Sequence, residues 1–116
     1  MRHLKNTKKL GRDRAQRKAL KKMLASSLIL HGKIQTTEAK ASFVRPYIEK
    51  IITACREKSL ISKRALNQDL NSKAAIKFSK DLAIKFAGKK GGYTRITKLF
   101  TRKGDNAKMV LLELIQ

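Results

Sequence analysis

The sequence predicts an α+β fold, in which a small mixed sheet of about three strands packs against about four helices. A basic, extended N-terminal arm precedes this unit. Three observations lead to this prediction. Between residues 13 and 87, apolar residues recur at three- and four-residue spacing, which is typical of amphipathic helices. Short stretches with strand-like alternation occur at residues 33–37 and near the C-terminus. Residues 1–12 are rich in cations and poor in apolar side chains.

The charge of the chain is its dominant property. Lys and Arg number 29 against 8 acidic residues, so the formal net charge is +21 over 116 residues. This length suits one domain, which we place at residues 13–116, with residues 1–12 as the arm. A compact particle with this charge repels itself unless polyanions surround it. Nucleic acid is the polyanion we favour, because Lys and Arg displace the counterions of its phosphates.

The first helix is predicted from Asp13, an N-cap with Gln16 at the position of a capping box, to a stop at Gly32. Its residues divide into two arcs at helical spacing. The arc expected to face the core holds Ala19, Leu20, Met23, Leu24, Leu30 and His31. The opposite arc holds Arg14, Arg17, Lys18, Lys21 and Lys22. Charged faces are usually only solvated, but they normally mix signs, so this one-signed arc favours contact with phosphate.

The remaining elements follow in order. "KIQTT" at residues 33–37 reads as a short strand, and Thr36 or Thr37 can cap a helix that extends to about Cys55. Pro46 is expected to kink or restart that helix. A further helix at residues 61–70 and another from Asn71 or Ser72 to about Ala87 complete the helical part. Cys55, the only cysteine, reads as a small core residue and suits a reducing cytosol.

The C-terminal quarter predicts a hairpin. "GKKGG" ends the last helix, residues 93–101 and 108–115 form strands, and Gly104, Asp105 and Asn106 suit the turn between them. The second strand has apolar residues on both faces, which predicts a central strand covered on both sides. Tyr93 could equally pack in the core or stack on a base.

Enzyme signatures are not evident in the sequence. "GKKGGYT" does not have the spacing of a phosphate-binding loop, and no cluster of acids or histidines suggests a metal or catalytic site. We therefore expect no enzyme activity, no cofactor, no metal and no small-molecule substrate. The apolar runs are too short for a membrane span or a signal peptide, so a cytoplasmic protein without a membrane partner is expected.

Several motifs occur together in a particular order: "MRH" at the start, a basic helix, "KIQTT", "GGYTRI", and "GDNA" before the last strand. In this combination the chain resembles the family of bacterial large-subunit ribosomal protein seventeen. The resemblance implies an arm embedded in large-subunit rRNA, on the solvent side near the peptide exit tunnel, and contacts with neighbouring ribosomal proteins. It also implies rRNA contacts at Arg2, His3, Arg17, Tyr93, Arg95 and Gly104–Asn106.

The resulting hypothesis is a structural constituent of the large ribosomal subunit that does not form a homo-oligomer. It would bind rRNA through the arm, the first helix and the hairpin. The predicted rRNA-binding residues are Arg2, His3, Lys5, Lys8, Lys9, Arg12, Arg14, Arg17, Lys18, Lys21, Lys22, Lys89, Lys90, Tyr93, Arg95, Arg102 and Lys103. The alternatives are an architectural DNA-binding protein, a nuclease or RNA-modifying enzyme, and a protein that binds anionic membrane surfaces.

Overall fold

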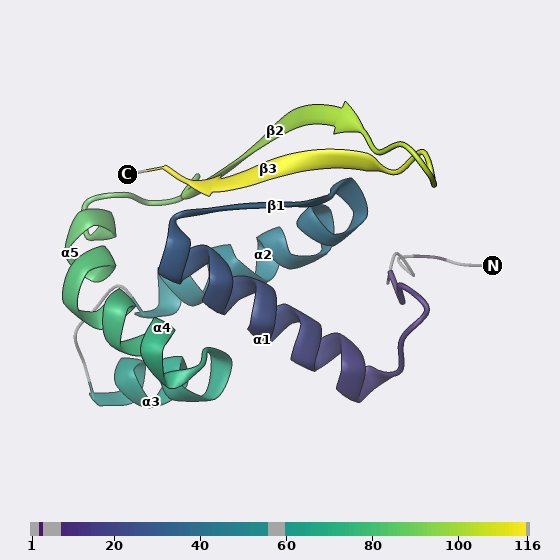
Figure 1. The fold of residues 1–116 in the computed structure, drawn as a ribbon. Helices are drawn as coiled ribbons and strands as arrows, with labels where there is room; N and C mark the ends of the chain where they lie inside the picture. Colours follow the sequence, from purple (N-terminus) through teal and green to yellow (C-terminus); the bar gives the residue numbers. More distant parts are fainter. Residues whose placement is uncertain (1–2, 4–7, 56–59, 116) are drawn as a thin grey trace.

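The fold consists of one antiparallel sheet with all its helices on one face (Figure 1). The computed structural model describes residues 3, 8–55 and 60–115. The elements, in chain order, are α1 (Arg14–His31), β1 (Lys33–Thr37), α2 (Glu38–Cys55), α3 (Leu60–Asp69), α4 (Ser72–Lys77), a π-helical turn η1 (Phe78–Leu82), α5 (Ala83–Phe86), β2 (Thr94–Thr101) and β3 (Lys108–Leu114). The predicted α+β class and the three strands are confirmed.

The local signals of α1 act as predicted. The Asp13 side chain accepts a hydrogen bond from the Gln16 backbone N–H (2.8 Å), and the Asp13 N–H donates to the Gln16 side chain (3.2 Å). Together these bonds satisfy two donors that an uncapped helix would leave free. Gly32 ends the helix with a φ of 80°, a conformation that costs glycine little.

The sheet has the order β1-β3-β2 and is antiparallel throughout, so the expectation of a mixed sheet is wrong. Gly32 is the only residue between α1 and β1, and its carbonyl accepts a hydrogen bond from the Leu114 N–H at 3.0 Å. This bond continues the antiparallel β1–β3 ladder past the Lys33–Glu113 pair.

Strand β3 is central, as predicted, but the helices cover only one of its faces (Figure 1). Val110, Leu112 and Leu114 are buried against the helices, whereas Met109 and Leu111 on the other face are half-buried. The expected cover on both sides is thus wrong. The side chains of the flanking strands partly shield the outer apolar residues of β3 from water. Leu111, for example, lies between its Cα partners on β1 and β2.

The core lies between the sheet and the helices and is made mostly of aliphatic side chains. Phe78, Phe86 and Tyr93 are its fully buried aromatic residues. The Phe86 and Tyr93 rings meet edge to face, with centroids 5.4 Å apart. A bond from the Asn71 N–H to the Ser26 hydroxyl (3.0 Å) joins α1 to the start of α4. This bond satisfies the buried Ser26 side chain.

The predicted core face of α1 is only partly right, since Leu20 is buried and Leu24 and Leu30 pack against the core. Ala19, Met23 and His31 are exposed, with Met23 at 59%. The buried residues of α1 are Leu20, Ala25, Ser26, Leu28 and Ile29. Two helical turns separate Lys18, Lys21 and Lys22 from Ala25, Leu28 and Ile29, so both sets lie on the same angular face. The division between cationic and buried residues therefore lies along the helix axis, and the first turns of α1 extend past the other helices (Figure 1).

The other helices follow their predicted bounds closely. Helix α2 continues through Pro46 without restarting, and the Thr37 hydroxyl accepts from the Lys40 N–H at 3.4 Å near its start. Asn71 caps α4, accepting from the Ala74 N–H at 2.9 Å. The helix predicted to reach Ala87 is α4, η1 and α5 in succession. The side chain of Cys55 lies outside the described part of the structure.

Candidate nucleic-acid interface

Three cations form an exposed stripe on α1. Arg14, Lys18 and Lys22 follow one another at four-residue spacing, so they occupy one side of the helix, and all three are exposed. None of them forms an ion pair with an acidic residue in the described part of the chain. A row of cations at this spacing can contact consecutive phosphates of a nucleic-acid backbone. We call these three residues the α1 stripe.

The other predicted cations of this region are used partly by the protein itself. The Arg17 guanidinium donates to the Arg12 carbonyl, and the Arg12 guanidinium donates to the Leu10 carbonyl at 2.9 Å. The Lys21 ammonium lies over the rings of Phe43 and Tyr47, 4.9 and 5.8 Å from their centroids. These three cations therefore stabilise local structure. The cationic surface of α1 that is free to contact a partner is narrower than predicted.

The segment before α1 approaches the helix through a tight turn. Leu10 and Gly11 both have positive φ, 53° and 65°, and the Arg12 N–H donates to the Lys9 carbonyl at 3.0 Å. This turn places Lys8 and Lys9, which are exposed, next to the start of the α1 stripe. His3 is also exposed. Arg2 and Lys5 lie outside the described residues.

Ion pairs neutralise two predicted cations of the hairpin. Arg95 contacts Glu113 on the neighbouring strand, with its Nη2 2.6 Å from the Glu113 Oε1. Arg102 contacts Asp105 within the turn through two hydrogen bonds. Lys103 is exposed and forms no ion pair with any described acid. The hairpin thus presents a smaller net charge than its Arg and Lys content implies.

The Arg102–Asp105 pair is the strongest electrostatic feature of the turn. The hydrogen bond from Arg102 and then the one from the Ala107 N–H lower the pKa of Asp105 from its ordinary 3.8 to about 2. The same hydrogen bond raises the pKa of Arg102. Gly104 and Asn106 have φ values of 80° and 56°, which bring the chain round so that the two side chains meet. The pair therefore orders the turn.

This pair predicts a pH dependence. Because the folded pKa of Asp105 is depressed, its contribution to stability is present above pH ~3.8 and is lost as pH falls through about 2. An NMR titration of the Asp105 carboxyl carbon should give a midpoint at about 2. Arg102→Ala should move that midpoint up toward 3.8. A midpoint near 3.8 in the unmodified protein would contradict the ion pair.

The segment between the last helix and the hairpin contributes less surface than predicted. Tyr93 is fully buried, and its hydroxyl donates to the Lys89 carbonyl at 3.1 Å. Of the two interpretations of Tyr93 that the sequence allows, core packing is the one the structure supports, so base stacking by this ring is not proposed. The Lys89 ammonium donates to the Ile115 carbonyl at 3.1 Å, and Lys90 is exposed.

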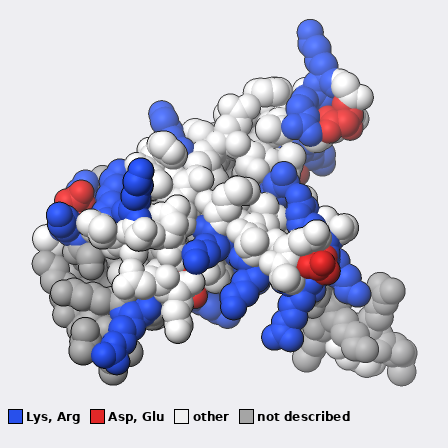
Figure 2. Space-filling view, turned by 60° about the horizontal axis from the view of Figure 1, so that its bottom comes forward, with Lys and Arg blue, Asp and Glu red and all other residues white. Residues whose placement is uncertain are grey.

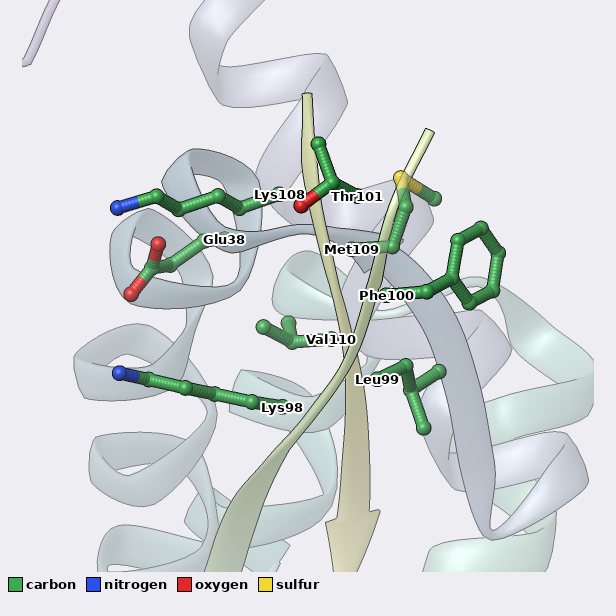
Figure 3. A pocket seen from close by; sticks show the side chains of 8 residues that line it. All are labelled: Glu38, Lys98, Leu99, Phe100, Thr101, Lys108, Met109 and Val110. Carbon is green, nitrogen blue, oxygen red and sulfur yellow. The ribbon is translucent and has the colours of Figure 1, made fainter. Parts of the chain in front are cut away.

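The distal end of the hairpin has cations that the predicted site omitted. Lys98 and Lys108 are exposed there, and Figure 3 shows their ammonium groups on the same side of the two strands. A strand-alternation pattern alone does not reveal this pair, because the register shifts between Lys98 and Thr101. On the face shown in Figure 2, Lys and Arg side chains project from several places and Asp and Glu are few.

The described residues hold no group of three or more His, Cys, Asp or Glu side chains suited to a metal ion. Within the same residues, no helix is both long enough and apolar enough to cross a bilayer. The features that stand out on this fold are therefore its cationic surfaces. Fold and surface together define a small, strongly cationic protein.

Comparison with known proteins identifies the family. The family described as Ribosomal protein L17 matches residues 20–115. A relative from Gemmatimonas aurantiaca is 47% identical over 99% of this chain and 98% of its own length, and one from Persephonella marina is 44% identical over 100% and 96%. A relative from Chlorobium phaeovibrioides is 45% identical, with 66% of its length covered. All three are named Large ribosomal subunit protein bL17. The chain belongs to the ribosomal protein L17 family.

Proposed function

We propose that the protein is a structural, non-enzymatic constituent of the large ribosomal subunit in the cytoplasm. The observation that carries this proposal is the match of nearly the whole chain to relatives that bear this name. The net charge of +21 supports it, because such a charge is tolerated best where phosphates surround the protein.

The rRNA is bound, in this proposal, mainly through the arm and the α1 stripe. The arm contributes Arg2, His3, Lys5, Lys8, Lys9 and Arg12, and the stripe contributes Arg14, Lys18 and Lys22. The turn at Leu10 and Gly11 supports this division, since it joins the two sets within a few residues. Lys90 and Lys103, in the C-terminal part of the chain, provide a second point of contact.

The location that we propose is the region around the peptide exit tunnel, next to other large-subunit proteins. The protein acts there as a single copy that brings RNA segments together by neutralising their phosphates. Contacts of this kind position a protein and carry little sequence information, so recognition depends mainly on the shape of the folded RNA.

Sedimentation of cell extracts tests this proposal. The tagged protein should migrate with large subunits in a sucrose gradient at physiological salt. Its binding to transcribed large-subunit rRNA should weaken as salt rises, with a slope of about −0.7 to −0.9 per phosphate contact. Absence from the large-subunit fractions would overturn the proposal. Equal affinity for duplex DNA and for the rRNA would favour an architectural DNA-binding protein instead.

A further inference from the structure

The distal end of the β2–β3 hairpin exposes apolar side chains. Leu99 is 43% exposed and Phe100 is 55% exposed, although both belong to a strand. The pairing with β3 changes register between Lys98 and Thr101, and this irregularity turns the two residues out of the alternation that packs the half-buried Ile96 against the core. Exposing a phenyl ring to water is unfavourable in proportion to its apolar area. A partner that covers Phe100 would therefore form a more stable complex.

The residues around Phe100 divide between the two sides of the strands. Figure 3 shows Leu99, Phe100 and Met109 directed to one side of the strands, and Lys98 and Lys108 directed to the other. All of these residues line a hollow of about 240 Å³ that also includes Glu38. The hollow is smaller than the ~300–1,000 Å³ of typical small-molecule sites, so it has room for a single small group. Arg102 and Lys103 follow within three residues of Phe100.

We propose that the hairpin end binds an unpaired nucleotide of the rRNA. The base packs against the Phe100 ring with Leu99 and Met109 beside it, and Lys103 in the adjoining turn contacts a neighbouring phosphate. Aromatic side chains next to cations are how proteins bind unstacked bases, since the ring takes the base face and the cations take the backbone. This inference rests on the proposed function and adds to it a site for a single unpaired base.

Charge and area favour a nucleotide over a protein segment. The outer sheet face beyond these residues is polar at its edges, with Lys33 and Gln35 on β1 and Thr97 on β2 exposed. A stable protein interface needs about 800 Å² from each partner, which three apolar side chains cannot supply. One base needs only one ring to stack on, and a phosphate next to it can reach the exposed Lys103 in the adjoining turn.

Binding of the full-length protein to transcribed large-subunit rRNA tests the site. Loss of one base–aromatic stack corresponds to roughly a 5- to 150-fold weaker dissociation constant, and this is expected for Phe100→Ala. Phe100→Tyr keeps a ring of similar shape and should bind nearly as well as the unmodified protein. The matched control is Ile76→Ala, since Ile76 on α4 is also 55% exposed and should leave affinity unchanged.

The salt dependence separates stacking from charge. Phe100→Ala should keep the slope of log K against log salt, because it removes no cation. Lys103→Ala should make that slope shallower by about 0.7 to 0.9. Unchanged affinity for Phe100→Ala, in a protein that otherwise binds the rRNA, would overturn the inference and leave the proposed function standing. Absence of any salt-dependent rRNA binding would overturn the proposed function itself.

A photo-crosslink identifies what covers the hairpin end in the assembled subunit. Phe100 is replaced by p-benzoylphenylalanine, and large subunits that carry the variant are irradiated. An adduct with rRNA supports the nucleotide site. An adduct only with a neighbouring protein would overturn it and assign the exposed face of Leu99 and Phe100 to a protein contact.

Discussion

Replacing Phe86 by alanine is expected to lower the free energy of unfolding by about 3–5 kcal/mol. Phe86 is fully buried and packs edge to face on Tyr93, so its removal leaves a cavity between the last helix and the start of β2. The loss is a large part of the ~5–15 kcal/mol that holds a typical domain together. Urea unfolding followed by circular dichroism at fixed salt measures it.

The matched control is Ile84→Ala in the same helix. Ile84 is 61% exposed, and its truncation should change the unfolding free energy by no more than about 0.5 kcal/mol. A loss below ~1 kcal/mol for Phe86→Ala would contradict the packing of α5 on Tyr93. Because Tyr93 directly precedes β2, the variant should also broaden the NMR signals of Thr94 and Arg95.

Replacing Arg14, Lys18 and Lys22 together by glutamine is expected to weaken rRNA binding roughly 100- to 500-fold at 0.1 M salt. Each lost phosphate contact removes about 0.7 to 0.9 from the slope of log K against log salt, so the slope should become shallower by about 2 to 3. A filter-binding or fluorescence titration with transcribed large-subunit rRNA at several salt concentrations measures both quantities.

A control with the same change in net charge uses Lys50, Lys73 and Lys80, which are exposed on α2, α4 and η1. Their replacement by glutamine should leave most of the affinity and slope in place. Equal losses in the two triple variants would show that only total charge matters, and would contradict a specific role of the α1 stripe. All substituted residues are exposed, so both variants should have an unfolding free energy close to that of the unmodified protein.

Sequence reasoning predicted the elements well and the buried face of α1 only in part. The bounds of α1 depend on Asp13, Gln16 and Gly32, which act within a few residues. The buried side of α1 depends on where the other helices end, and periodicity contains no such information. Met23 lies on the side of the helix opposite Ala25 and Leu28, so it is exposed although its spacing fits an apolar stripe.

The predicted site shows the same division. The excess of cations over acids could be read directly from composition, and the exposed α1 stripe lies within the predicted set. Arg95 and Arg102 were predicted as free contacts, but each has an acidic partner in the folded chain. Glu113 is 18 residues from Arg95, so only the register of β2 on β3 brings them together. The exposure of Phe100 follows from a register shift, for which the sequence pattern gives no signal.

The sequence by itself determined the charge, the class of partner, the family and the places where helices and strands begin and end. These properties come from composition and from contacts between near neighbours, such as the Asp13 cap and the Gly104 turn. The tertiary structure decided which cations are free, that Tyr93 is buried, and that one sheet face and Phe100 are open. Those outcomes depend on packing and strand register between distant segments, and the physical interactions that set them do not exist until the chain has folded.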